Sequence, residues 1–385
     1  MINENKAHSN KPFAQKVKRI MLTIPVLLLV CVLILVGILL AYSPGKPESF
    51  VDENGKLLVG SISEKVFVDI NGVKQGMFIK SKDINNPVLL FVHGGPGMPE
   101  YWLTQRYPTG LEDYFTVVWW EQRGAGLSYS PTIPPETMTA EQFISDTLEV
   151  TNYLRKRFGK EKIYLMAHSW GSYIGIQAAA QKPELYYAYI GMGQISYQIQ
   201  SEQLAYQYAL EQYKKNGNTN MVERLESAPP TMTVPLPAAY DALRDEYMHG
   251  AGIGTTHDME SVITGIFLPS WHFREYTLGE KINLWRGKFF SRSQNFSLWD
   301  KMQTTDLTQQ VTELEIPAYF FEGRYDYTCA YPLAKDYFDK LKAPMKGFYT
   351  FERSAHTPLF EEPEKMQRIL QEDILAGVNN LADTK

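Results

Sequence analysis

Residues 162–171 read KIYLMAHSWG, and this stretch decides the fold. The part before the serine is apolar without the alternation that marks a half-exposed strand, so we expect a strand buried on both faces. A helical pattern follows directly and continues to about residue 181. We therefore expect a tight strand-to-helix turn that lifts Ser169 above a sheet. Ala167, Gly171 and Gly175 are small enough to let the two backbones approach.

The same rhythm of buried strand and helix recurs on both sides of this turn. Further strands without alternation are expected at residues 88–92, 116–120, 188–192, 316–322 and 347–351. Helices are expected at residues 139–158, where a capping box opens the helix, and at 332–341 and 364–376. This order predicts an α/β fold with a mostly parallel sheet covered by helices on both faces. An Asn71-Gly72 turn adds an antiparallel hairpin in front of it.

Residues 197–306 interrupt the rhythm. They are mostly helical in pattern, with a Pro-rich joint at residues 229–237 and a glycine loop at residues 250–254. An insertion between strands of an open sheet lies over their carboxyl ends, where such sheets bind ligands. We therefore expect a core of residues 61–196 and 307–385, with residues 197–306 as a helical lid.

The N-terminal region predicts a membrane segment. Residues 1–19 form a basic tail, and residues 20–42 read IMLTIPVLLLVCVLILVGILLAY without a charge. A helix of this length spans the roughly 30 Å hydrocarbon core of a bilayer. The positive-inside rule places the tail in the cytoplasm and the rest of the chain outside. We expect a retained single-pass anchor in the cell membrane, followed by a linker at residues 43–60.

Two other interpretations of this segment are weaker. A cleaved signal peptide usually has a shorter apolar run and a small-residue cleavage site, which the end of this run lacks. A lipoprotein signal ending at Cys31 is disfavoured by the bulky Val30 before the cysteine.

Composition narrows the classes of partner and cofactor. The formal net charge is −5 and no basic stripe follows the tail, so nucleic acid is not an expected partner. Of the two cysteines, Cys31 lies in the apolar run and Cys329 lies in the predicted core. A disulfide would have to join a membrane segment to the catalytic domain, so we expect none. No motif indicates a metal or an organic cofactor, and we expect neither.

The turn at Ser169 carries the strongest chemical signal. It matches the G-x-S-x-G nucleophile elbow with Ala in the first position, at the junction where that pattern is meaningful. A serine hydroxyl needs a base to take its proton. Of seven histidines, His356 lies in the loop after the last predicted strand, where a base belongs. His168 should point away from the site, because it is adjacent to the serine on the turn.

A carboxylate should orient the base. Asp326 follows the predicted strand at residues 316–322, whereas the rivals Asp300 and Asp306 precede it. The chain order Ser169, Asp326, His356 is the one expected for a serine elbow on such a sheet.

An anionic intermediate would need two backbone donors. One should be the N–H of Trp170, directly after the nucleophile. The other should come from the loop His-Gly-Gly-Pro-Gly at residues 93–97, where Gly94 and Gly95 let the backbone approach a substrate closely.

Three motifs together resemble the proline iminopeptidase family of α/β-hydrolases. They are HGGPG at residues 93–97, WEQRGAGLS at residues 120–128 and the serine elbow. The resemblance implies the α/β-hydrolase fold and an enzyme that releases N-terminal residues, proline above all, from short peptides through an acyl-enzyme. It also implies Ser169 as nucleophile, Asp326 and His356 as its triad partners, and Gly94 or Gly95 with Trp170 as the oxyanion hole.

The resemblance leaves the substrate open. Glu121 stands where the family usually has Asp, and a membrane anchor is unusual for it. Family members hold the substrate amine with acidic lid residues. The lid here offers Glu202, Glu246, Glu260 and Glu275, but the motifs do not indicate which of them, if any, has this role. A buried carboxylate facing the serine would favour peptides or amides, and an apolar tunnel would favour an esterase of small or lipid esters. A third alternative is a catalytically silent binding protein on the same fold.

Overall fold

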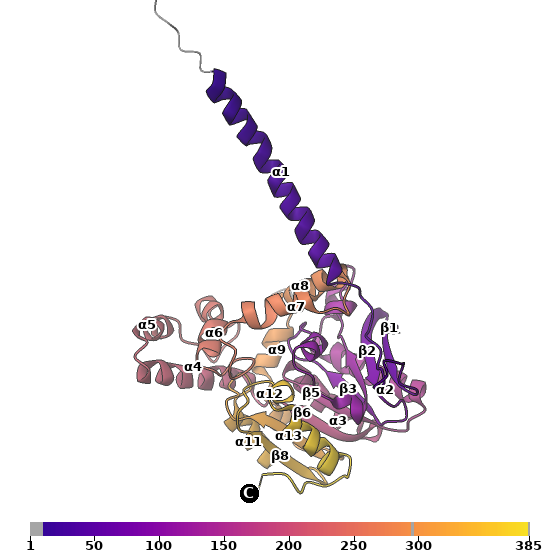
Figure 1. Ribbon diagram of the computed structural model, residues 1–385. Coiled ribbons are helices and arrows are strands. Elements are labelled where there is room, and N and C mark those ends of the chain that lie inside the picture. The colour runs from indigo at the N-terminus through magenta and orange to yellow at the C-terminus, as the bar shows by residue number, and fades with distance from the viewer. Residues whose placement is uncertain (1–10, 294–295, 384–385) are drawn as a thin grey trace, which may run out of the picture.

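The structure is a computed structural model that describes residues 11–293 and 296–383. In this part of the chain, eight strands form one sheet in the order β1-β2-β4-β3-β5-β6-β7-β8 (Figure 1). The strands are β1 (Ile62–Ile70), β2 (Val73–Ser81), β3 (Val88–Val92), β4 (Thr116–Trp120), β5 (Ile163–His168), β6 (Tyr186–Met192), β7 (Ala318–Gly323) and β8 (Lys346–Phe351). The first two form the expected hairpin, β2 is antiparallel to β4, and the other neighbours are parallel.

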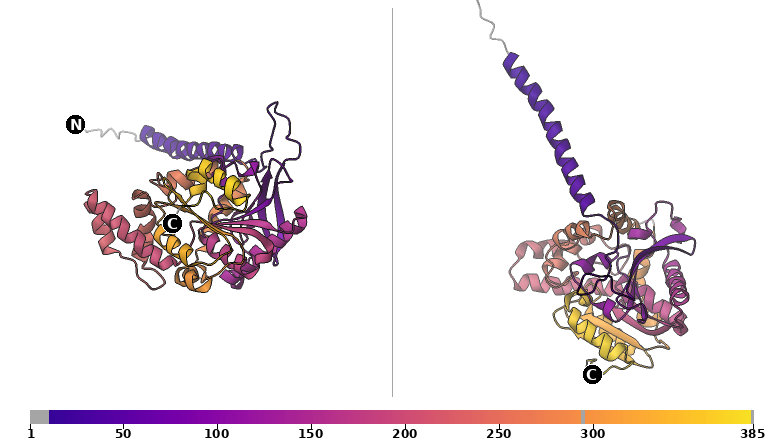
Figure 2. Two further views of the ribbon diagram at one scale, coloured as in Figure 1. Left: turned by 90° about the horizontal axis from the view of Figure 1, so that it is seen from below. Right: turned by 45° about the vertical axis from the view of Figure 1, so that its right-hand side comes forward.

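Both faces of the sheet are buried, which explains why its strands lack alternation. In β3, Leu90 packs into the core cluster on one face, and Leu89 packs into the cluster on the other. The first face is covered by α2 (Ala140–Phe158), α3 (Trp170–Gln181) and α11 (Tyr331–Lys340). The second is covered by α13 (Pro363–Ile369) and a π-helical turn, η7 (Leu370–Ile374), in place of the single longer helix expected there. Figure 2 shows helices on both sides of the sheet.

The lid leaves the core after β6 and returns before β7. Its elements are α4 (Gln198–Lys215), α5 (Thr219–Ser227), α6 (Ala238–Gly250), the π-helical segment η6 (Ile263–Phe267), α7 (Leu268–His272), α8 (Leu278–Ser291) and α9 (Leu298–Thr304). A β-bridge between Tyr197 and Asp306 joins the two ends of the insertion. The helices α4, α5 and α6 share an apolar cluster of their own, so this part of the lid has its own small core.

Short elements complete the fold. They are the 3-10 turns η1 (Tyr101–Gln105), η2 (Leu111–Asp113), η3 (Gly126–Ser128), η4 (Pro135–Thr137) and η5 (Pro183–Leu185), and the helices α10 (Leu307–Gln310) and α12 (Pro358–Glu361).

The N-terminal helix α1 (Lys11–Ala41) projects from the domain (Figure 1). Within its segment Lys16–Ala41, an 18-residue window has a mean hydropathy of 3.3, and none of that window is buried against the fold. One helix in the described part of the chain is thus long and apolar enough to cross a membrane, a property that a signal sequence would share. The helix begins within the predicted tail, and residues 1–10 of that tail lie outside the described residues.

Two charged residues of the motif at residues 120–128 are buried in the core. Arg123 is fully buried and donates from Nε and Nη2 to the two carboxylate oxygens of Asp146 at 2.8 and 2.9 Å. Glu121 accepts hydrogen bonds from the Leu127 N–H and from the Tyr276 hydroxyl of the lid. Glu121 therefore joins a core loop to the lid, and burial raises its pKa to about 8.

This raised pKa predicts a pH-dependent stability. A carboxyl group with a pKa near 4.5 when unfolded and about 8 when folded favours the native state fully below pH 4.5, and this contribution is lost as pH rises through 8. We expect Glu121→Gln to reduce the fall in unfolding free energy between pH 5 and 8, by up to about 1.4 kcal/mol per pH unit. Chemical unfolding of the full-length protein in detergent would measure it. The exposed Glu364→Gln is the control, and equal slopes for both variants would contradict the expectation.

Candidate active site

The turn between β5 and α3 carries Ser169. This residue has φ of 55° and ψ of −124°, a backbone conformation that is uncommon for any residue but glycine. Helix and strand approach so closely that a Cβ at Gly171 would lie 2.0 Å from the carbonyl oxygen of Val92. A Cβ at Gly175 would lie 2.6 Å from the Cβ of Ala167. The small residues therefore allow a turn that presents the serine above the sheet.

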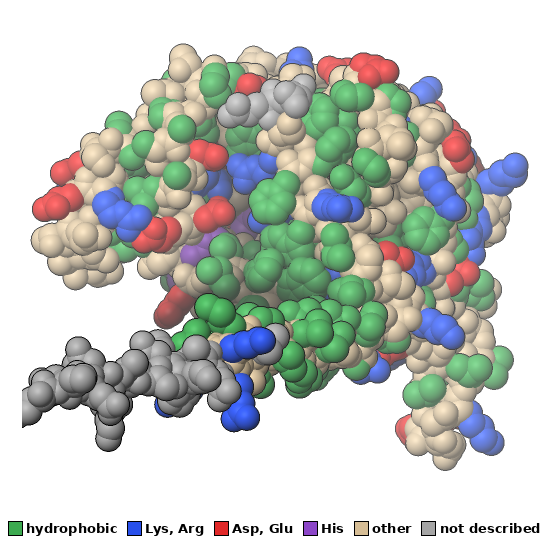
Figure 3. Space-filling model, turned by 90° about the horizontal axis from the view of Figure 1, so that it is seen from above, with side chains coloured by type: hydrophobic (Ala, Val, Ile, Leu, Met, Phe, Trp, Pro, Cys, Tyr) green, Lys and Arg blue, Asp and Glu red, His purple; other side chains and the backbone are tan. Residues whose placement is uncertain are grey.

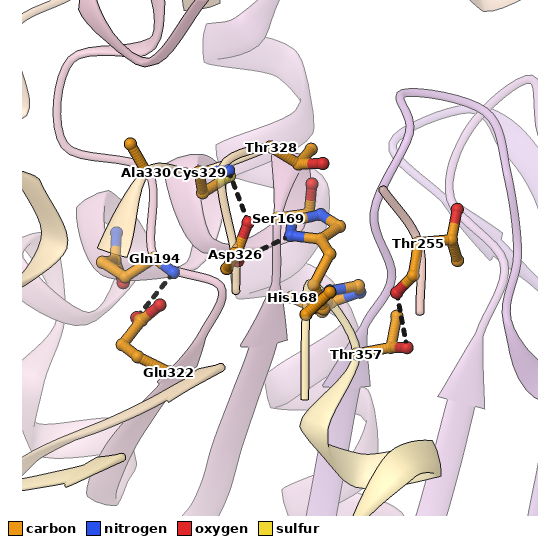
Figure 4. Close-up of polar contacts among 12 residues, drawn as sticks. His168, Ser169, Gln194, Thr255, Glu322, Asp326, Thr328, Cys329, Ala330 and Thr357 are labelled. Carbon is orange, nitrogen blue, oxygen red and sulfur yellow. Dashed lines mark hydrogen bonds and ion pairs between the residues drawn. The ribbon is translucent and has the colours of Figure 1, made fainter. Parts of the chain in front are cut away.

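Asp326 and His356 form a hydrogen-bonded pair beyond the carboxyl ends of β7 and β8. His356 Nδ1 lies 2.8 Å from Asp326 Oδ2, and Asp326 Oδ1 accepts the N–H of Cys329 at 2.9 Å (Figure 4). Since Nδ1 donates to the carboxylate, Nε2 is the ring nitrogen left to accept a proton. The rival Asp306 instead accepts the N–H of Thr308 at the start of α10.

Ser169 and His356 line one cavity of about 180 Å³ between sheet and lid. Its apolar wall consists of Met98, Trp102, Leu103, Val262 and Ile266. Its polar lining includes Glu100, His168, Asp245, His249, Lys288 and Arg292. Gly193 supports the histidine from behind, because a Cβ there would lie 3.0 Å from His356 Nδ1 and 3.1 Å from Asp326 Oδ2.

The backbone donors expected for an oxyanion differ in their availability. The Gly94 N–H donates to Glu100 Oε1 at 2.7 Å, so it is already occupied. The N–H groups of Gly95 and Trp170 make no hydrogen bond to any described residue. Of the two glycines, the geometry therefore leaves Gly95 beside Trp170 as the available donor. Only glycine fits at position 95, because φ there is 123° and a Cβ would lie 2.6 Å from the Gly97 nitrogen.

Gln122 connects the two loops that supply these donors. Its side chain accepts the indole N–H of Trp170 at 2.9 Å and donates to the carbonyl oxygen of His93 at 2.6 Å. Its backbone N–H donates to His93 Nε2 at 3.1 Å. Burial lowers the pKa of His93 to about 4, so this ring is neutral and accepts that bond. The motif at residues 120–128 thus sets the distance between the serine elbow and the glycine loop.

His168 does not point away from the site, contrary to the expectation from its place on the turn. Its Nδ1 lies 2.8 Å from Glu100 Oε1 and its Nε2 lies 2.8 Å from the carbonyl oxygen of His356. Both partners are acceptors, so both ring nitrogens must carry a proton. Burial alone would lower the pKa of His168, but the Glu100 carboxylate raises it above its ordinary value. A buried imidazolium–carboxylate pair thus lies beside Ser169.

Only one of the two carboxylate oxygens of Glu100 accepts hydrogen bonds from the described residues. Burial would raise its pKa, but the charge and hydrogen bond of His168 and the N–H of Gly94 hold it below the usual range, so Glu100 is ionised. Its Oε1 accepts two hydrogen bonds, whereas Oε2 has no partner among the described residues. Glu100 therefore brings an incompletely paired negative charge to the cavity wall.

A second buried acid adjoins the Asp326 side of the site. Glu322 accepts the N–H of Gln194 at 2.8 Å, and burial together with the charge of Asp326 raises its pKa well above the ordinary value (Figure 4). Burial and the same aspartate also raise the pKa of the Cys329 thiol. Burial therefore favours the neutral forms of Glu322 and Cys329 next to the Asp326–His356 pair.

The lid acids named from the sequence do not line the cavity. Glu202 is buried against Arg244, whose Nε lies 2.6 Å from Glu202 Oε2, and Glu246 pairs with Arg224 at the surface. Glu275 accepts from Lys80 and Tyr101 outside the cavity, and Glu260 is exposed. The lid carboxylate that does line the cavity is Asp245, on α6.

Two residues of the site were missed by sequence reasoning. Glu100 follows the glycine loop, but one carboxylate in a turn has no distinguishing pattern before the fold brings it to His168. Gly193 follows β6, and its contact with the Asp326–His356 pair depends on three strands that are distant in sequence. Among the described residues, no group of three or more His, Cys, Asp or Glu side chains is placed to hold a metal ion.

Comparison with known proteins places the chain among hydrolases. The family model described as "alpha/beta hydrolase fold" matches residues 87–249. A Bacillus subtilis protein named "Probable aminopeptidase YbaC" is 36% identical over 298 residues, which cover 77% of this chain and 91% of that protein. The proline iminopeptidase of Clostridium botulinum is 26% identical over 301 residues, covering 74% and 89%.

Solved structures support the same fold. The proline iminopeptidase-related protein of Thermus thermophilus superposes with a TM-score of 0.55 at 18% identity, covering 82% of this chain and 98% of that one. The proline iminopeptidase of Mycobacterium smegmatis superposes with a TM-score of 0.56 at 15% identity, covering 80% of this chain and 96% of that one. The α/β-hydrolase fold expected from the motifs is thereby confirmed.

The packing of Gly193 against the histidine is testable by substitution. Gly193 has φ of 53°, so Gly193→Ala should both strain the backbone and displace His356. We expect kcat of hydrolysis to fall at least tenfold, with the fold retained by circular dichroism. Gly217→Ala is the matched control, because Gly217 has φ of 71° but no atoms within 4 Å of its Cβ position. Equal activity of the two variants would show that the contact with His356 is unimportant.

Proposed function

Because the chain belongs to the aminopeptidase and proline iminopeptidase group of the α/β-hydrolases, we propose that it is a membrane-anchored serine aminopeptidase. It releases N-terminal residues from short peptides through an acyl-enzyme at Ser169. One observation carries the proposal: His356 Nδ1 lies 2.8 Å from Asp326 in the wall of the cavity that also contains Ser169.

The proposed reaction assigns a role to each of these residues. Ser169 Oγ attacks the carbonyl carbon of the N-terminal residue while its proton passes to His356 Nε2. Asp326 accepts from Nδ1, which keeps the ring in the correct tautomer and stabilises its charged form. The N–H groups of Gly95 and Trp170 donate to the carbonyl oxygen as it becomes negative.

The acyl-enzyme then forms and is hydrolysed. The C–N bond breaks as protonated His356 gives its proton to the leaving amine. Water next attacks the ester carbonyl with His356 as base, which releases the amino acid and restores the Ser169 hydroxyl. All protons are exchanged between serine, histidine, water and the leaving group, so no other reactant is needed.

Glu100 is suited to bind the substrate's free amine. A Cβ at Gly94 would lie 3.0 Å from Glu100 Oε1 and 3.1 Å from Ser169 Cβ, so the carboxylate lies roughly within 6 Å of the nucleophile's Cβ. An α-amine is one carbon away from the carbonyl that the serine attacks, which suits this separation. Oε2 is buried and has no partner among the described residues, so it is the carboxylate oxygen that the proposal assigns to the ammonium, and the charge of His168 keeps the carboxylate ionised.

The anchor places this activity outside the cytoplasm. The apolar part of α1 is unburied and follows the basic residues Lys16, Lys18 and Arg19 in the first turns of the same helix, which supports a single membrane span with the N-terminus in the cytoplasm. The catalytic domain then faces the outside of the cell membrane.

Substitution of the triad tests the proposed chemistry. Ser169→Ala should lower kcat about 10⁶-fold. Asp326→Asn should lower kcat about 10⁴-fold, because the histidine then adopts the wrong tautomer. The full-length protein in detergent is assayed on a prolyl amide, an alanyl amide and a short acyl ester. Asp306→Asn is the matched control for the acid and should be neutral. Retained turnover in Ser169→Ala, or the opposite order of the two aspartates, would refute these roles.

Substitution of Glu100 tests the amine site. Glu100→Gln should lower kcat/KM for the amides about 30-fold, because a charged hydrogen bond of about 2 kcal/mol is lost. Hydrolysis of the acyl ester, which has no amine, should fall clearly less than that of the amides, because only the loss of the His168 pair affects it. The control is Glu246→Gln, which breaks a surface ion pair of the lid outside the cavity. It should change the hydrolysis of neither the amides nor the ester. An equal loss on amides and ester would mean that Glu100 only positions its loop.

A further inference from the structure

The lid carries an exposed apolar surface, which we call the lid patch. Five of its residues are large hydrophobic side chains with exposed fractions of 39–70%: Ile263, Phe267, Leu268, Ile282 and Phe289. The half-buried Trp271 and Trp285 lie between them. Soluble proteins rarely gather so many large apolar side chains at the surface unless the surface binds something.

The patch is one continuous surface on three elements. Ile282, Trp285 and Phe289 share the outward face of α8, at spacings of three and four residues. The ring of Phe267 lies 4.9 Å from that of Trp285 and 6.1 Å from that of Trp271, measured between centroids. These contacts join η6 and α7 to α8. The opposite face of α8 is buried, so the apolar residues point away from the domain.

The segment after α1 is fixed to the lid beside this patch. Lys281 on α8 donates from Nζ to the carbonyl oxygens of Tyr42 and Trp271, at 2.7 and 2.6 Å. The Gly45 N–H donates to the carbonyl oxygen of Arg274 at 3.1 Å. The helix therefore leaves the domain at the lid through a hydrogen-bonded connection. Figure 1 shows α7 and α8 at its base, and Figure 3 shows hydrophobic side chains gathered on the face from which it rises.

We propose that the lid patch lies in the interfacial layer of the bilayer that α1 crosses. This rests on the membrane anchor of the proposed function. A helix that spans the bilayer must bring the face at its base to the membrane surface, and that face carries the patch. Tryptophan is enriched at such interfaces, and flanking cations reach the headgroups. Arg286 is the exposed cation on α8, the helix that carries Trp285 and Phe289.

The contact has a consequence for the catalytic cavity. Val262 and Ile266 line the cavity, and their neighbours Ile263 and Phe267 belong to the lid patch. One short π-helical segment thus has one side on the substrate and the other on lipid. The bilayer then holds the lid, and peptides enter the cavity close to the membrane surface.

Photo-crosslinking of the full-length protein tests the proposal. The photoreactive residue p-benzoylphenylalanine is placed singly at Phe289 in the patch, at Leu33 in α1, or at Tyr187. Tyr187 is the matched control, an exposed aromatic residue at the start of β6. Each protein is reconstituted into vesicles of phosphatidylethanolamine and phosphatidylglycerol, irradiated and analysed by mass spectrometry. We expect lipid adducts at residues 33 and 289 at least tenfold above those at residue 187.

The outcomes separate the two proposals. Adducts at residue 33 but only background at residue 289 would leave the anchor standing and overturn the membrane contact of the lid. Background at residue 33 would overturn the anchor, and the lid contact with it. Covalent dimers from residue 289 in place of lipid adducts would show that a second copy of the chain covers the patch, which also overturns the proposal.

Discussion

At the turn from β5 into α3, the helix starts so close to the neighbouring strand that a Cβ at Gly171 would lie 2.0 Å from the carbonyl oxygen of Val92. The missing side chain at Gly171 permits this approach, and at the same turn Ser169 takes φ of 55°. Local strain of this kind persists only where the surrounding structure determines it. Here the parallel strands on both sides of β5 do so, and the same sheet brings Asp326 and His356 to the edge where the serine emerges.

A buried charge pair holds the loops around that serine. The imidazolium of His168 donates to Glu100 and to the carbonyl oxygen of His356, while Glu100 accepts from the Gly94 N–H. Removing two charges from water is costly unless their remaining hydrogen-bonding groups are satisfied. His168 meets this condition and Glu100 does not, because its Oε2 is unpartnered. The site therefore contains a fixed pair of charges in which one carboxylate oxygen has no partner among the described residues, and the proposed function assigns this carboxylate to the substrate's amine.

The lid links this site to the proposed membrane surface. Its segment around residues 262–267 lines the cavity on one side and exposes large apolar side chains on the other. The chain leaving α1 is hydrogen-bonded to the same part of the lid through Lys281. Anchor, lid and cavity are thus mechanically connected. In the proposed arrangement, α1 both tethers the catalytic domain and sets which of its faces meets the bilayer.

The sequence by itself determined the parallel sheet, the serine turn and the apolar helix. Each depends on neighbours along the chain: apolar runs, small residues at fixed offsets and an uncharged segment long enough to span a bilayer. Only the tertiary structure decided that His168 turns into the site, that Glu100 accepts the Gly94 N–H, and that Asp245 lines the cavity whereas the four lid acids considered from the sequence do not. These outcomes depend on contacts between segments far apart in the chain, such as the bond from His168 to the His356 carbonyl across 188 positions. A local pattern carries no information about such pairs, because their energy arises only once the sheet has brought them together.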